Sequence, residues 1–182
     1  MLALALLSMT LLQAGPDEAR QRSIELAAGV EYSTFLDAHR KVASLYGSAA
    51  GASAFGPRVS LALRQGSLEL ATSATVYPSS SGVAVANDFF AMGTKQWSRL
   101  ALLFGGGAGW FFTTPGTLVP TYSNQSIGPS IHARAHLVWK LNWRLSAEAD
   151  VAAFLYPLQR FLVLPVGVDL RCSLGLALAL DA

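Results

Sequence analysis

The sequence predicts a transmembrane β-barrel of eight antiparallel strands, and three observations carry this prediction. Apolar and polar residues alternate with a period of two over several long segments, which is typical of strands with two different faces. Only 13% of the residues are charged, whereas soluble domains carry about 25%. The longest apolar segment after the N-terminus, 100–112, contains four glycines and is shorter than the roughly 20 residues of a spanning helix. A closed barrel is the other structure that satisfies every backbone group in lipid.

The N-terminal segment MLALALLSMTLLQAG indicates a secretory signal peptide over residues 1–15. No Lys or Arg precedes its apolar region and no small-x-small cleavage motif follows, so an uncleaved anchor or a misplaced start is the alternative. Residues 23–182 are then expected to form a single barrel domain, because they contain no internal repeat or linker.

Eight strands follow in order along the chain. The first strand shows this alternation, because Ile24, Leu26 and Val30 lie on one face and Ser23 and Glu25 lie on the other. The glycines of residues 105–107 leave open whether the fifth strand is one strand or two short ones. The strands are expected at 23–33, 58–65, 67–77, 83–92, 97–113, 128–141, 143–156 and 162–178.

The connections between these strands differ in length. Gln65-Gly66 fits a tight hairpin, because glycine readily adopts a positive φ. A second tight turn is expected at Asn142 and a short one at 93–96, whereas 34–57 and 114–127 are long. Outer-membrane barrels have short periplasmic turns and long extracellular loops. We therefore expect both ends of the barrel domain to lie in the periplasm.

Three segments, LLFGGGAGWFF, WKLNWRLSAEADVAAF and VLPVGVDLRCSLGLALAL, resemble small outer-membrane β-barrel proteins of the opacity-like superfamily. The resemblance covers most of residues 23–182 and implies a location in the bacterial outer membrane. Such barrels commonly end on an aromatic residue that the barrel-assembly machinery recognises, whereas this chain ends Leu180-Asp181-Ala182. We expect a monomer whose partners are outer-membrane lipid and, during biogenesis, the barrel-assembly machinery.

The alternation assigns each side chain to the lipid or to the lumen. An Arg or Lys facing lipid near the midplane costs about 2–4 kcal/mol, so the charged positions are expected inside and paired. A soluble barrel with ordinary core aromatics is the alternative. The expected interior charge network is Arg134, His136, Glu148, Asp150, Asp169 and Arg171, with Glu25, Arg58, Arg64, Glu69 and Arg99 also facing inward. The expected lipid face includes Leu137, Leu145, Val151, Val168 and Leu170, with Tyr32, Trp110, Phe112, Trp139 and Trp143 near its borders.

The hairpin around Asn142 has a testable register. Opposite residues of an antiparallel pair share a face, so polar positions pair with polar positions. The most symmetric turn pairs Arg134 with Asp150 and His136 with Glu148. A shift by two residues, which pairs Arg134 with Glu148, is the alternative.

Function is the least determined feature of the sequence. No basic cluster supports nucleic-acid binding, and Cys172 is the only cysteine. His132 and His136 are about 13 Å apart by the strand rise, so we expect no metal site. No compact nucleophile–base–acid set lies on neighbouring residues, so we expect no catalysis, and we expect no cofactor. The leading hypothesis is a structural, adhesive or protective role through the extracellular loops. A lipid hydrolase with Ser130 as nucleophile and His132 as base, and a narrow pore or small-ligand barrel, are the alternatives.

Overall fold

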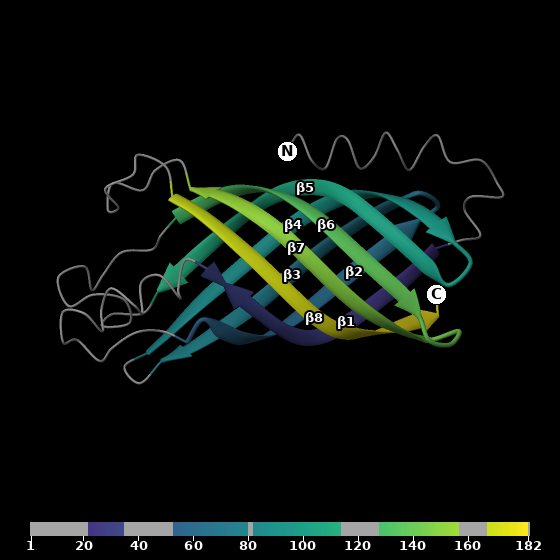
Figure 1. Ribbon diagram of the computed structural model, residues 1–182, viewed down its shortest axis with the longest axis horizontal. Coiled ribbons are helices and arrows are strands. Elements are labelled where there is room, and N and C mark those ends of the chain that lie inside the picture. Colours follow the sequence, from purple (N-terminus) through teal and green to yellow (C-terminus); the bar gives the residue numbers. More distant parts are fainter. Residues whose placement is uncertain (1–21, 35–52, 80–81, 114–127, 157–166, 182) are drawn as a thin grey trace.

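The computed structural model describes residues 22–34, 53–79, 82–113, 128–156 and 167–181, whose strands close into one barrel (Figure 1). Each strand pairs antiparallel with its neighbours in the sequence, and β1 pairs with β8, so the predicted up-and-down barrel is confirmed. No helix in the described part of the chain is long and apolar enough to cross a membrane. The strands are β1 (Arg22–Ser33), β2 (Phe55–Gln65), β3 (Leu68–Ser79), β4 (Gly82–Trp97), β5 (Leu100–Thr113), β6 (Gly128–Lys140), β7 (Leu145–Tyr156) and β8 (Gly167–Asp181).

The main differences from the predicted strand boundaries are at β4, β5 and β8. β4 continues to Trp97, so the turn predicted at 93–96 is wrong, and the chain reverses at Ser98 and Arg99 instead. Ser98 adopts a positive φ of 43° there. β5 is one strand, Leu100–Thr113, and is not split at its glycines. β8 extends to Asp181, beyond the predicted end at 178.

The predicted register of the β6–β7 hairpin is wrong in both of its versions. His136 lies opposite Asp150, and Arg134 lies opposite Ala152. The physical reason is a longer turn over 141–144, in which Asn142 Oδ1 accepts hydrogen bonds of 2.8 Å from the backbone N–H groups of Arg144 and Leu145.

The two ends of the barrel differ. The turns at 66–67, 98–99 and 141–144 lie at the end where β1 begins and β8 ends. The connections 35–52, 114–127 and 157–166 leave from the opposite end and lie outside the described residues, as do the predicted signal peptide at 1–15 and Ala182. The asymmetry of outer-membrane barrels predicts that the end with the short turns is the periplasmic one, and it is called the periplasmic end below.

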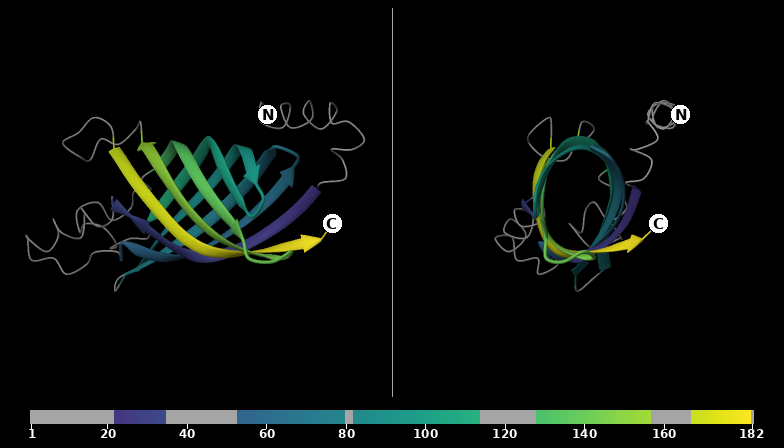
Figure 2. Two further views of the ribbon diagram at one scale, coloured as in Figure 1. Left: turned by 45° about the vertical axis from the view of Figure 1, so that its right-hand side comes forward. Right: turned by 90° about the vertical axis from the view of Figure 1, so that its right-hand side faces the viewer.

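Glycines allow close backbone approach where β1 and β8 curve along the closing seam (Figure 2). Gly29 and Gly175 lie opposite each other in the β1–β8 pair. A Cβ atom on Gly29 would lie 2.2 Å from the carbonyl oxygen of Leu174, which no side chain tolerates without a backbone shift. The end-on view in Figure 2 shows the strands forming an elongated ring around the lumen.

The alternation of faces follows the prediction with one exception. Leu137, Val151, Val168 and Leu170 are exposed on the outer face, together with Trp110 and Trp139, whereas Tyr32 and Leu145 are half-buried. Trp143 lies in the 141–144 turn and is exposed; the side chain of Phe112 lies outside the described set. The predicted inward position of Arg99 is wrong, because the shifted turn places Arg99 at the exposed rim.

Candidate functional site: the charged lumen of the barrel

The periplasmic half of the lumen is crossed by an ion-pair layer. Arg64 of β2 donates to Glu69 Oε2 of β3 at 2.6 and 3.0 Å and to Glu25 Oε1 of β1 at 2.9 Å. On the other side, His136 Nε2 of β6 lies 3.5 Å from Glu148 Oε2 of β7. His136 Nδ1 lies 3.9 Å from Glu69 Oε1, so the layer reaches from β3 across the lumen to β6.

A second layer fills the middle of the barrel around Asp150. Asp150 Oδ2 accepts hydrogen bonds from Arg58 Nη1 of β2 and, at 3.3 Å, from Arg134 Nη1 of β6. Arg58 also donates to Ser173 on β8. Arg134 Nη2 lies 3.6 Å from Asp88 Oδ2 of β4. Asp150 thereby joins three strands that are not all neighbours in the sheet.

Arg171 of β8 organises the extracellular side of this layer. Its Nε donates to Asp169 Oδ2 at 2.7 Å, and its Nη1 lies 3.4 Å from Asp88 Oδ2 and 3.7 Å from Glu31 Oε1. The Tyr77 hydroxyl donates to the same Glu31 oxygen at 2.5 Å. Arg171 exposes only 1% of its surface, so these carboxylates, and not water, surround its guanidinium group.

Aromatic rings separate the cations of the middle layer. The guanidinium carbon of Arg134 lies 4.1 Å from the ring centroid of Phe90, and that of Arg171 lies 3.9 Å from the ring centroid of Phe154. The His132 ring packs 4.5 Å from Phe154 and 6.2 Å from Phe90. Cation–π contacts of this kind stabilise desolvated guanidinium groups.

Together these contacts fill the lumen. Seven carboxylates and four guanidinium groups of the described residues lie inside the barrel. A void of about 10 Å³ borders Arg58, Glu148 and Ser173, which is about the space that one water occupies. Breaking such a buried pair by removing one partner leaves an uncompensated charge and costs about 3–5 kcal/mol. The network therefore plugs the barrel and depends on its complete set of partners.

The predicted network residues fall into two groups. His136 and Glu148 belong to the periplasmic layer, whereas Arg134, Asp150, Asp169 and Arg171 belong to the middle layer. The prediction omitted two carboxylates, Glu31 and Asp88, and the rings of Phe90 and Phe154. Asp88 follows the inward Ala84 and Ala86 at even spacing, and this parity is the signal that could have found it.

The geometry does not assemble the candidate hydrolase site. Ser130 and His132 are both buried on the lumen side of β6. Neither ring nitrogen of His132 has a hydrogen-bond partner among the described residues, so the ring does not contact the Ser130 hydroxyl as a base would. Within the same residues no group of three His, Cys, Asp or Glu side chains could hold a metal ion.

Solved structures of small outer-membrane barrels share this fold. The N-terminal β-barrel domain of Pseudomonas aeruginosa OprF matches with a TM-score of 0.62 and 15% identity, over 87% of this chain and 97% of that domain. Neisserial surface protein A matches with a TM-score of 0.52 and 13% identity, over 88% of this chain and 97% of that one. Ail of Yersinia pestis, solved with the heparin analogue sucrose octasulfate, matches with a TM-score of 0.50 and 12% identity, over 87% of this chain and 97% of that one. No protein-family model and no curated protein matches the chain.

The chain therefore has the fold of small eight-stranded outer-membrane β-barrels, with an apolar exterior and a charged lumen.

Proposed function

We propose that the protein is a non-catalytic, monomeric outer-membrane barrel that acts through its extracellular connections, in a structural, adhesive or protective role. The observation that carries the proposal is the filled lumen, in which Arg58, Arg134 and Arg171 are each held by carboxylates of other strands. A lumen closed in this way leaves the surface as the place of function.

Two alternatives have less support. A pore requires a water-filled path, and the stack of Arg134, Phe90, His132 and Phe154 lies across the lumen. A hydrolase requires a hydrogen-bonded nucleophile and base, and His132 packs between two rings instead.

Replacement of the extracellular connections tests the proposal. Residues 36–51, 115–126 and 158–165 are each exchanged for a short Gly-Ser linker, and the variants are expressed in cells that lack the native protein. We expect surface adhesion or serum survival to be lost while the barrel still shows heat-modifiable migration. Ail was solved with a heparin analogue, so a sulfated polysaccharide is a suitable first ligand for the adhesion assay.

The matched control is the double variant Ser130→Ala/His132→Ala, which leaves the connections intact. We expect this variant to keep the surface phenotype. If the linker variants keep the phenotype and the double variant loses both it and lipid hydrolysis with the barrel folded, the protein is an enzyme and the proposal fails.

A further inference from the structure

Cations and tryptophans gather on one sector of the periplasmic rim. The β4–β5 and β6–β7 turns, with the strand ends beside them, carry Lys95, Arg99, Lys140 and Arg144. Three of the four tryptophans of the chain, Trp97, Trp139 and Trp143, lie in the same sector and are exposed by 46%, 58% and 73%. This sector of the rim, formed by 95–100 and 139–144, is called the cationic rim below.

The two turns of the cationic rim lie side by side. The backbone N–H of Lys140 donates to the Arg99 carbonyl oxygen at 2.8 Å, and Leu100 lies opposite Trp139. The Lys95 ammonium lies 5.5 Å from the ring centroid of Trp97. Both Lys95 and Trp97 are exposed on the outward parity of β4, so the charge faces the membrane boundary and not the lumen.

The charge that the rim presents to the outside comes from the exposed Lys95 and Arg99, because Lys140 lies on the lumen parity of β6 and Arg144 has an interaction partner of its own. Asp88, Glu148 and Asp150 of strands β4–β7 all lie on the lumen side, in the network described above. Neither Lys95 nor Arg99 forms an ion pair with a described residue. Lys95 and Arg99 thus present positive charge at the exposed rim, beside the exposed Trp97 and Trp139.

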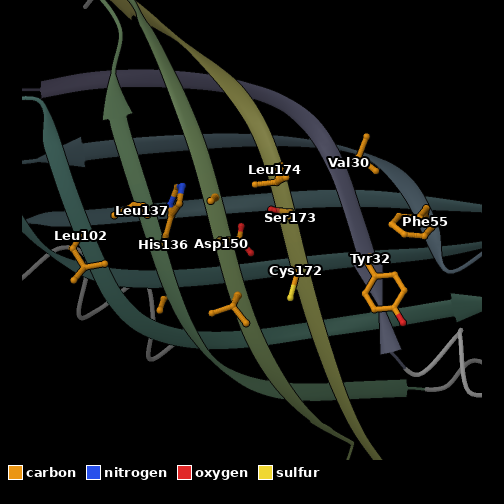
Figure 3. A pocket seen from close by; sticks show the side chains of 13 residues that line it. Val30, Tyr32, Phe55, Leu102, His136, Leu137, Asp150, Cys172, Ser173 and Leu174 are labelled. Atoms are coloured by element: carbon orange, nitrogen blue, oxygen red, sulfur yellow. The ribbon is translucent and has the colours of Figure 1, made fainter.

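An apolar groove of about 600 Å³ begins beside the cationic rim. Leu102 and Leu137 lie opposite each other, one outward position along the strands from Leu100 and Trp139. From there the groove crosses the small side chains of Ala135 and Ala149. Figure 3 shows its lining on neighbouring strands, from Leu102 and Leu137 past Cys172 and Leu174 to Tyr32 and Phe55.

We propose that the cationic rim and this groove bind one anionic phospholipid of the inner leaflet. Its phosphate lies against Lys95 and Arg99, and one acyl chain lies in the groove over Ala135 and Ala149. Charge complementarity selects an anionic headgroup, because basic side chains near a membrane surface attract anionic lipids. Lysine reaches the headgroup with its alkyl stem along apolar surface, and tryptophan prefers the same boundary because its ring is amphipathic.

Native mass spectrometry of the full chain, refolded in detergent, tests the headgroup contact. The protein is titrated with phosphatidylglycerol or phosphatidylcholine of identical acyl chains. We expect the protein to retain one phosphatidylglycerol molecule in preference to phosphatidylcholine. We expect the affinity for phosphatidylglycerol to be about tenfold lower in Lys95→Gln/Arg99→Gln. The control Lys41→Gln/Arg160→Gln removes the same charge from the connections that leave the opposite end, and we expect it to retain the adduct.

A substitution pair tests the groove. Ala135→Phe fills the floor of the groove and is expected to weaken retention of both lipids. Ala133→Phe adds the same side chain one outward position along β6, outside the groove lining, and is expected to leave retention unchanged. Equal effects of these two variants would overturn the placement of the acyl chain.

Other outcomes also decide the proposal. Three results would overturn it. The first is unchanged phosphatidylglycerol retention in Lys95→Gln/Arg99→Gln, and the second is an equal loss in the Lys41→Gln/Arg160→Gln control. The third is preferential retention of lipid A at the same residues. If the variants lose heat-modifiable migration, the unmodified protein is reconstituted with brominated lipids. Tryptophan fluorescence should then be quenched more by brominated phosphatidylglycerol than by brominated phosphatidylcholine, and equal quenching would overturn the proposal.

Discussion

His136 lies opposite Asp150 in the β6–β7 pair, yet its Nε2 atom is 3.5 Å from Glu148. The contact is diagonal, because Glu148 is directly opposite Val138. Asp150 in turn accepts hydrogen bonds from Arg58 of β2 and from Arg134, which lies diagonally across from it on β6. Which charged side chains pair in this lumen therefore depends more on how far they reach across the narrow barrel than on the strand register.

Loss of Arg171 should destabilise the barrel. Arg171→Leu leaves Asp169, Asp88 and Glu31 without their shared cation, and we expect a loss of about 3–5 kcal/mol. Adding Asp169→Asn to that variant removes one unpaired charge and should recover part of the loss. Urea unfolding in lipid vesicles, followed by tryptophan fluorescence, measures both variants. No recovery in the double variant would mean that the cost of Arg171→Leu is packing and not charge.

Widening the stack of rings should open the lumen. Phe90→Ala/Arg134→Ala removes the ring and the guanidinium that lie 4.1 Å apart. In planar bilayers we expect no channel events from the unmodified protein and measurable conductance from the variant. Val151→Ala, on the lipid face, is the control and should remain closed. Conductance from the unmodified barrel would contradict a plugged lumen.

The closing seam should not tolerate a side chain at Gly29. A Cβ atom there would lie 2.2 Å from a backbone oxygen, so Gly29→Ala is expected to cost about 1–3 kcal/mol through forced backbone shifts. Gly93→Ala is the matched control, because its Cβ would meet its nearest atom at 3.9 Å. The measurement is the fraction of each refolded variant that shows heat-modifiable migration. Equal folding of the two variants would contradict the tight contact of β1 with β8.

The β6–β7 turn should depend on the Asn142 side chain. Asn142→Ala removes the acceptor of two backbone hydrogen bonds, and each such bond contributes about 0.5–1.5 kcal/mol. Asn142→Asp keeps the oxygen and should retain most of the stability. Urea unfolding of the two variants distinguishes them, and equal loss in both would show that the oxygen contributes nothing to the turn.

Much of the fold follows from local patterns in the sequence. Period-two alternation over Ile24–Tyr32 and Val168–Leu176 already assigned the two faces, because adjacent side chains of a strand point to opposite sides. The same alternation could not place the turns. Residues 93–96 are Gly, Thr, Lys and Gln, a run that breaks the alternation and predicts a turn, yet β4 continues through it to Trp97.

The strand count, the antiparallel order, the two faces and the charged character of the lumen could all be predicted from the sequence, since each depends on composition and on parity along one strand. The pairing of the charges could not be predicted in this way. Glu31, Asp88 and Arg171 come from β1, β4 and β8, and no spacing within a strand encodes a contact across the lumen. The position of such contacts depends on barrel curvature, on the 141–144 turn and on the glycines at the seam, all of which act together once the barrel closes.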